Sequence, residues 1–121
     1  MTSAPLRAVV DVSVAFKLFV PEAHSAQAQA VFGRFASGHD AELIVPDCFF
    51  IECANVFRKW VRRSAYPAPA AQAHLRDLTG LGLTAIPDDV LTDVALDMAL
   101  KHRLGAYEAC YLAVATQLLL H

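Results

Sequence analysis

Short apolar runs alternate along this chain with longer segments that carry helix start and stop signals. A short, continuous apolar run bounded by polar residues or proline is typical of a strand that is buried on both faces of a sheet. Strands that alternate with helical segments predict an α/β domain with a parallel sheet, arranged as a three-layer α/β/α sandwich. We expect strands at residues 7–10, 42–45 and 83–86, and helices at 13–20, 24–36, 48–64, 70–78, 90–104 and 106–119.

Prolines, aspartates and glycines mark the ends of these helices. Pro21 ends the first helix, because the residue before a proline disfavours the helical region. Asp47 can accept hydrogen bonds from the free amides of the helix that follows it, and Asp88 or Asp89 can do the same after the third strand. Gly105 is expected to take the left-handed conformation that closes the helix before it.

The chain has 121 residues, of which 56% are hydrophobic and 18% are charged. That length suits a single domain over residues 1–121, and the apolar content predicts a well-packed core. A formal net charge of −2 argues against general electrostatic binding of nucleic acid, although it allows a local basic patch. Cys48, Cys53 and Cys110 lack the spacing of a zinc site, which favours reduced thiols and a cytoplasmic location. No signal peptide or apolar run of membrane-spanning length is seen, so we expect no membrane contact.

Asp11 comes directly after the apolar run of the first predicted strand, and Ser13 follows two positions later. Ligands of parallel α/β sheets bind just beyond the carboxyl ends of the strands. Asp11 is therefore the first candidate site residue. The alternative is a purely structural cap of the helix that follows.

Glu52 is predicted to lie in an early turn of the helix that follows the second strand. On a helical wheel it falls opposite the apolar face, together with Asn55, Lys59 and Arg63, and this position favours a solvated helix face. However, an early turn after a strand end still lies within reach of the carboxyl edge of the sheet. Glu52 is therefore the second candidate.

Glu108 lies on the helix at 106–119, which is apolar nearly all round and which we therefore expect to be buried. It shares a helical stripe with Leu112, Ala115 and Leu119. A buried carboxylate is costly unless it is protonated, paired or bound to a metal ion, so Glu108 is the third candidate. The alternative is a first-turn glutamate whose head reaches water and interacts with the helix dipole.

Carboxylates from three separate elements repel one another when they converge at one edge of a sheet. A divalent cation removes that repulsion, and hard oxygen ligands select Mg²⁺ or Mn²⁺ rather than zinc. Such an ion lowers the pKa of bound water and neutralises the charge that develops on a phosphate. Asp11, Glu52 and Glu108 therefore suit the hydrolysis of a phosphodiester bond.

Arg58, Lys59, Arg62 and Arg63 form a cationic cluster on the helix at 48–64. The simplest interpretation is a solvated helix face. The alternative is a track for an RNA backbone that leads to the acids.

Three segments of the chain resemble, taken together, the motifs of PIN domains of the kind found in VapC toxins. The first is residues 9–22 (VVDVSVAFKLFVPE), the second is residues 46–59 (PDCFFIECANVFRK) and the third is residues 106–115 (AYEACYLAVA). Their order and spacing also fit the family, and the resemblance covers nearly the whole chain.

The resemblance implies a Mg²⁺- or Mn²⁺-dependent endoribonuclease that acts as the toxin of a VapBC-type toxin–antitoxin pair. RNA would be its substrate, and a VapB-like antitoxin would block its site. Asp11, Glu52 and Glu108 match the metal-site acids of the family. Ser13 would support the site near Asp11, and Asn55 lies one helical turn from Glu52.

Two features depart from the family pattern. Glu108 stands where the family usually has aspartate, and its extra methylene moves the carboxylate by about one bond length, whereas metal sites need placement within about half an ångström. The chain also ends where the family continues with a further strand beside the first and with a fourth acid, so we expect a domain that lacks its C-terminal strand. The first strand would then have an open edge, which predicts that a homodimer partner, a rearranged segment or further residues cover it.

These departures leave a second hypothesis open, a catalytically impaired PIN-like module that acts by binding a protein partner or RNA. A third hypothesis is an unrelated α/β regulator, such as a receiver domain with Asp11 as its phosphoacceptor. That class needs a basic residue after a late strand, and the sequence has none there.

Overall fold

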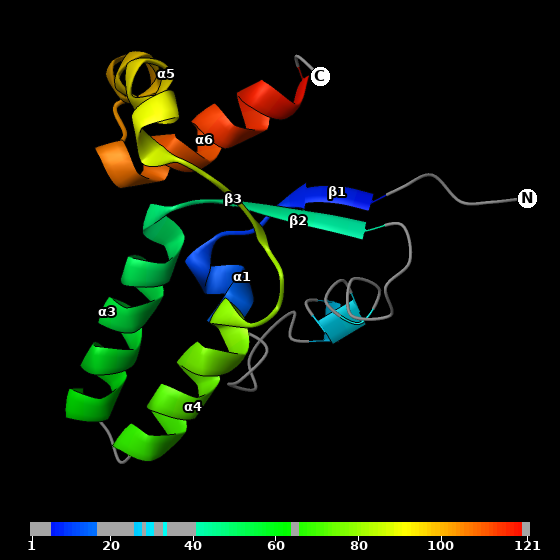
Figure 1. The fold of residues 1–121 in the computed structure, drawn as a ribbon. Coiled ribbons are helices and arrows are strands. Elements are labelled where there is room, and N and C mark those ends of the chain that lie inside the picture. The colour runs from blue at the N-terminus through cyan, green and yellow to red at the C-terminus, as the bar shows by residue number, and fades with distance from the viewer. Residues whose placement is uncertain are drawn as a thin grey trace, which may run out of the picture.

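The computed structural model describes residues 6–16, 26–27, 29–30, 33, 41–63 and 66–119. Strands and helices follow one another in the predicted order (Figure 1). The helix expected at 24–36 and the end of the helix expected at 13–20 lie largely outside the described residues. The elements are β1 (Leu6–Val9), α1 (Val12–Phe16), β2 (Ala41–Pro46), α3 (Cys48–Arg63), α4 (Ala68–Thr79), β3 (Thr84–Ile86), α5 (Asp88–His102) and α6 (Ala106–Leu119).

The described strands form one parallel sheet in the order β1-β2-β3. Val9 lies opposite Ile44 in the first pair, and Ile44 lies opposite Thr84 in the second. Because the strands are parallel, their carboxyl ends lie along the same edge of the sheet, where Asp11 follows β1. Within the described residues β1 pairs only with β2, so the expected cover of its other side stays a prediction.

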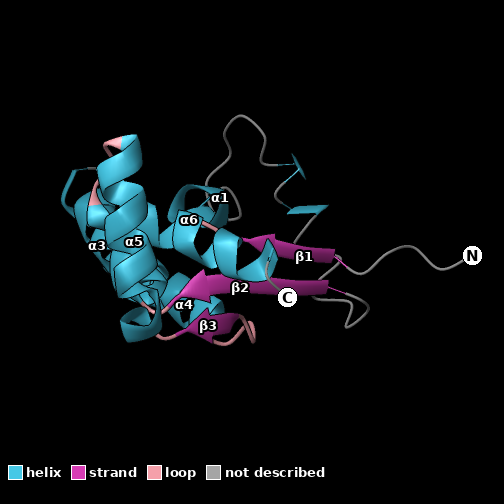
Figure 2. Cartoon of the chain, turned by 90° about the horizontal axis from the view of Figure 1, so that it is seen from above, coloured by secondary structure: helices cyan, strands magenta, loops and turns pink. Residues whose placement is uncertain are grey.

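Helices cover both faces of the sheet (Figures 1 and 2). Leu43 and Val45 of β2 pack against α1, α3 and α4, whereas Ile44 between them packs against α5 and α6. Alternation of side chains along the strand produces these two faces. The predicted α/β sandwich with a parallel sheet and a helical layer on each side is confirmed.

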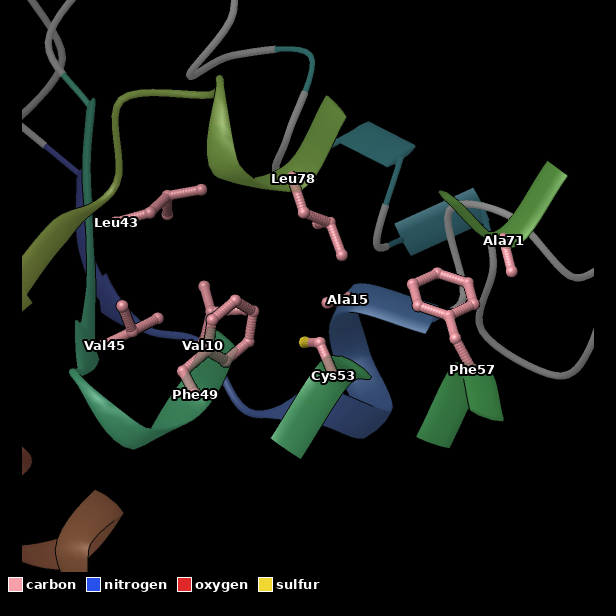
Figure 3. Close-up of a cluster of buried hydrophobic side chains, with 9 residues drawn as sticks. All are labelled: Val10, Ala15, Leu43, Val45, Phe49, Cys53, Phe57, Ala71 and Leu78. Carbon is pink, nitrogen blue, oxygen red and sulfur yellow. The ribbon is translucent and has the colours of Figure 1, made fainter. Parts of the chain in front are cut away.

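Each face of the sheet carries its own apolar core, and the two cores fix α3 and α6 against opposite sides of the strands. In the first core, side chains from the sheet and from its three covering helices point toward one another (Figure 3). Its buried members are Val10, Ala15, Leu43, Val45, Phe49, Cys53, Phe57, Ala71 and Leu78. Those of the second core are Ile44, Leu91, Ala95, Ala109, Ala113 and Val114. None of the helices described here has the length and apolarity needed to cross a membrane.

The prediction that Asp88 or Asp89 caps α5 is wrong. The helix begins at Asp88, with Pro87 at the N-cap position and no side-chain cap bond. The carboxylate of Asp88 instead accepts a hydrogen bond from the backbone amide of Cys48 at 3.2 Å. It thereby satisfies one of the free amides at the start of α3, a role that the sequence suggested for the exposed Asp47.

The left-handed residue after α5 is Arg103, with φ 54° and ψ 46°, and not the expected Gly105. The amide of Leu104 donates to the carbonyl of Ala99 at 3.1 Å, which closes the helix end earlier than predicted. Gly105 is already part of the start of α6, because its carbonyl accepts the amide of Ala109 at 3.0 Å.

Arg103→Gly is expected to raise the free energy of unfolding by about 0.5–1 kcal/mol, because glycine adopts a positive φ without the steric cost of a Cβ atom. Urea denaturation measures this change. Leu100→Gly is the matched control at an exposed helical position of α5 and should lower the same free energy by about 0.8 kcal/mol. A fall of equal size in both variants would contradict the prediction.

Candidate active site

Asp11, Glu52 and Glu108 line one cavity of about 290 Å³, which we call the acid cavity. Asp11 lies between β1 and α1, Glu52 lies in the second turn of α3, and Glu108 lies in the first turn of α6. The structure thus brings together the three carboxylates that the sequence singled out. The other described residues of the wall are Val12, Ser13, Tyr107 and Tyr111.

Asp11 is oriented by the segment that follows it. The hydroxyl of Ser13 donates to Oδ1 of Asp11 at 2.9 Å, and the amide of Ala15 donates to the backbone carbonyl of Asp11 at 3.2 Å. Asp11 therefore lies at the start of α1, the position expected of a helix cap, and it also lines the acid cavity. The contact from Ser13 matches the supporting position that the resemblance implied.

Glu52 is half-buried and is held through both of its carboxylate oxygens. The phenolic hydroxyl of Tyr111 on α6 donates to Oε2 at 3.0 Å. The thiol of Cys48, one turn earlier on α3, donates to Oε1 at 3.5 Å. The solvated face that the helical wheel predicted does not include Glu52, because its carboxylate contacts α6. The other residues of that stripe are exposed, namely Asn55, Lys59 and Arg63.

Burial and the nearby carboxylates raise the pKa of the groups that surround Glu52. Burial is the main cause for Tyr111, and the negative charge of Glu52 adds to it, so the pKa of this phenol lies well above its ordinary value. Burial also raises the pKa of the Cys48 thiol, with Glu52 and Asp88 as further causes. The pKa of Cys53 is raised to about 12 by burial and then by Glu52. Tyr111 and Cys48 therefore stay protonated at neutral pH and remain hydrogen-bond donors to Glu52.

Glu108 is exposed, so the expectation of a buried carboxylate is wrong. The helix α6 is not buried all round, because Tyr107 is 66% exposed and Leu112 is 40% exposed. The positive end of the helix dipole favours a carboxylate in this first turn. Among the described side chains of α6, Ala109, Ala113 and Val114 are fully buried, and Cys110 and Tyr111 pack against the cores.

The donor chemistry of the acid cavity fits a hard divalent cation. Its three carboxylates carry the kind of oxygen donor that such an ion prefers, and no lysine or arginine lines the cavity among the described residues. Within the part of the chain that the structure describes, however, no three histidine, cysteine or acidic side chains are grouped closely enough to hold an ion by themselves. Mg²⁺ usually keeps several waters and is bound by one or two carboxylates, so the cavity suits a hydrated ion rather than a cage of protein ligands.

Asn55 and the cationic cluster lie outside the acid cavity. Oδ1 of Asn55 accepts hydrogen bonds from Nε and Nη2 of Arg58 at 3.1 and 3.0 Å on the exposed side of α3. Lys59, Arg62 and Arg63 are exposed as well. Arg58 and Arg62 line a separate, largely apolar groove of about 280 Å³ between α3 and α4, which shares no described residue with the acid cavity.

Tyr107 and Tyr111 were not candidates from the sequence, although both line the acid cavity. The available signal was their spacing relative to Glu108, which lies between them on α6. Residues three apart share a helix face, and Tyr111 lies three positions after Glu108. A search of this motif for polar side chains on the face of Glu108 would have found Tyr111.

No protein-family model matches the chain, and no curated protein matches it. The resemblance to PIN domains therefore rests on the three sequence motifs, and membership of that family stays a prediction.

Proposed function

We propose that this chain is a Mg²⁺- or Mn²⁺-dependent endoribonuclease and acts in the cytoplasm as the toxin of a VapBC-type pair. One observation carries the proposal: carboxylates from three separate elements line a single cavity. Carboxylates that line one cavity attract cations, and acids that hold a divalent ion suit phosphodiester hydrolysis. The three PIN-like motifs supply the choice of RNA as substrate.

Asp11 and Glu52 would hold the cation, and Glu108 would be the third acid. A bound ion of this kind lowers the pKa of its water and neutralises charge on the phosphate during in-line displacement. The exposed carboxylate of Glu108 adds negative charge at the mouth of the cavity, which attracts cations from solution.

The chain itself orients the two acids that would hold the ion. Ser13 donates to one oxygen of Asp11, while Tyr111 and Cys48 each donate to one oxygen of Glu52. Each carboxylate offers about four lone-pair sites, so these contacts fix its direction and leave acceptor capacity for a ligand.

The partners in this proposal are RNA, a VapB-like antitoxin and a second copy of the chain. The exposed cluster Arg58, Lys59, Arg62 and Arg63 supports contact with an RNA backbone. The side of β1 that has no partner strand among the described residues supports pairing with another chain.

Incubation of the purified chain with single-stranded RNA tests the function. Cleavage is expected with Mn²⁺ or Mg²⁺, should stop when EDTA is added and should return when the metal is restored. The proposal fails if cleavage is equally fast in EDTA.

Tyr111→Phe is expected to weaken Mn²⁺ binding and to slow cleavage by about 10- to 100-fold, the usual cost of losing a group that orients a metal ligand. The phenylalanine keeps the ring but cannot donate to Glu52. Tyr107→Phe removes a hydroxyl from the wall of the same cavity and is the matched control, with an expected rate equal to that of the wild type. Equal loss in both variants would contradict a specific role for Tyr111.

A catalytically impaired PIN-like module that binds RNA or a protein is the second candidate. It is favoured by the absence, among the described residues, of three ligating side chains grouped around one point. Such a module would bind RNA but leave it intact in Mn²⁺, so the cleavage experiment separates the two candidates.

A further inference from the structure

We propose that a second cavity, between α5 and α6, holds one unpaired base of the RNA beside the acid cavity, with the ring of Tyr107 as its stacking surface. This inference rests on the proposed function, because it assigns a place to the substrate of that site. The cavity has a volume of about 260 Å³, and its walls include Ala95, Leu96 and Ala99. We call it the base cavity.

The two cavities are neighbours that share part of their walls. Tyr107 lines both of them. Cys48 lines the base cavity, and its thiol donates to Glu52 in the wall of the acid cavity at 3.5 Å. A nucleotide whose phosphate lies at the acids therefore has the base cavity as the adjacent recess for a base.

Tyr107 and Leu96 present apolar surface that the fold does not use. Tyr107 is 66% exposed and Leu96 is 61% exposed, and neither belongs to the buried cores. Both side chains line the base cavity, so their apolar surface is accessible to a ligand that enters it. Single-stranded nucleic acids are recognised by bases that stack on aromatic side chains, which is the geometry that an exposed tyrosine at a cavity wall offers.

The polar groups of the base cavity favour a base over a phosphate. Asp88 contributes a carboxylate, and no lysine or arginine lines this cavity among the described residues. The hydroxyl of Thr92 donates to the backbone carbonyl of Asp89 at 3.1 Å, so its oxygen is left as an acceptor. The amino group of cytosine or adenine can donate two hydrogens to such acceptors, whereas the pairing edge of uracil has a single N–H group that lies between two carbonyl oxygens. The cavity is therefore expected to prefer an amino-bearing base.

Fluorescence anisotropy with labelled oligocytidylate, oligoadenylate and oligouridylate tests the inference on the full chain. Asp11→Asn is the background, because this substitution is expected to slow cleavage of the RNA during the measurement. Tyr107→Ala should weaken binding of the cytidine oligomer by about 5- to 150-fold, the loss expected for one stacked base. Tyr107→Phe keeps the ring and should restore the binding that Tyr107→Ala loses. Leu100→Ala should bind like its parent, because it removes an apolar side chain that is 73% exposed but lies outside the cavity.

Asp88→Asn tests the base preference, because an amide can donate as well as accept. The variant can still accept the amide of Cys48, so the contact between α5 and α3 is retained. The parent should bind the cytidine and adenosine oligomers more tightly than the uridine oligomer, and Asp88→Asn should lose that difference.

Unchanged RNA affinity in Tyr107→Ala would overturn the inference, as would an equal loss in Leu100→Ala. A change in self-association of Tyr107→Ala, measured by sedimentation, without a change in RNA affinity would assign the surface to protein contact and would also overturn it. The proposed function is tested separately. Cleavage that needs no metal, together with RNA binding that depends on Tyr107, would reject the metal-dependent nuclease and retain the base cavity. Cleavage that needs a metal, together with RNA binding that does not depend on Tyr107, would retain the nuclease and reject the base cavity.

Discussion

Asp11→Asn is expected to slow metal-dependent RNA cleavage by at least about a hundredfold, because losing even a group that orients a metal ligand costs about 10- to 100-fold. The amide has nearly the same size and can still accept the hydroxyl of Ser13, so the local structure is retained. The substitution removes the negative charge by which the side chain would hold a hard cation. Initial cleavage rates of a labelled single-stranded RNA at saturating Mn²⁺ measure the effect.

Asp77→Asn is the matched control for this experiment. It makes the same chemical change at an exposed position of α4, outside the acid cavity, and should cleave at the wild-type rate. Glu52→Gln should lose activity as Asp11→Asn does, and the double variant should lose little more, because residues that act as one unit are not additive. Cleavage at the wild-type rate by Asp11→Asn would assign the activity to a contaminating nuclease.

Phe49→Ala is expected to lower the free energy of unfolding by about 3–5 kcal/mol, through lost burial and a cavity in the core. Phe49 is fully buried where α3 meets the sheet (Figure 3). Its ring also makes an edge contact with that of Phe50, with centroids 5.2 Å apart. Since domains of this kind are stable by about 5–15 kcal/mol, the loss is a large part of the total. Urea denaturation followed by circular dichroism measures it.

Ile51→Ala is the control for the core substitution. Ile51 lies two residues further along α3 but is 74% exposed, so its truncation should change the free energy of unfolding by no more than about 0.5 kcal/mol. Similar losses in Phe49→Ala and Ile51→Ala would contradict the burial of these two residues.

The strands and helices were predictable because their signals are local. The apolar run at 43–45 lies within β2, and the alternation of side chains places Leu43 and Val45 on one face and Ile44 on the other. The end of α5 was not predictable in the same way. Arg103 takes the left-handed conformation, whereas the carbonyl of the nearby glycine, Gly105, accepts a hydrogen bond from the first turn of α6.

The sequence suggested which acids come together at one cavity, but it did not reveal the side chains that contact them. The positions of Asp11 and Glu52 after strand ends suggested one edge of the sheet for both, and the structure places both in the wall of the acid cavity, although the helical wheel favoured a solvated face for Glu52. The partner of Glu52 is Tyr111, which lies 59 residues away in the chain, and no local pattern reveals such a contact. The exposure of Glu108 was not predictable either. It depends on which side of α6 packs against the sheet and α5, and Ala109 and Ala113 are buried there while Glu108 is not.

Titration of Mn²⁺ into the chain by isothermal calorimetry tests most directly whether Asp11 and Glu52 hold a metal ion in the acid cavity. The wild type and Asp77→Asn are expected to show the same saturable binding, and Asp11→Asn and Glu52→Gln are expected to lose it. No binding by the wild type at millimolar Mn²⁺, or the same binding in all four proteins, would contradict a metal site in the acid cavity.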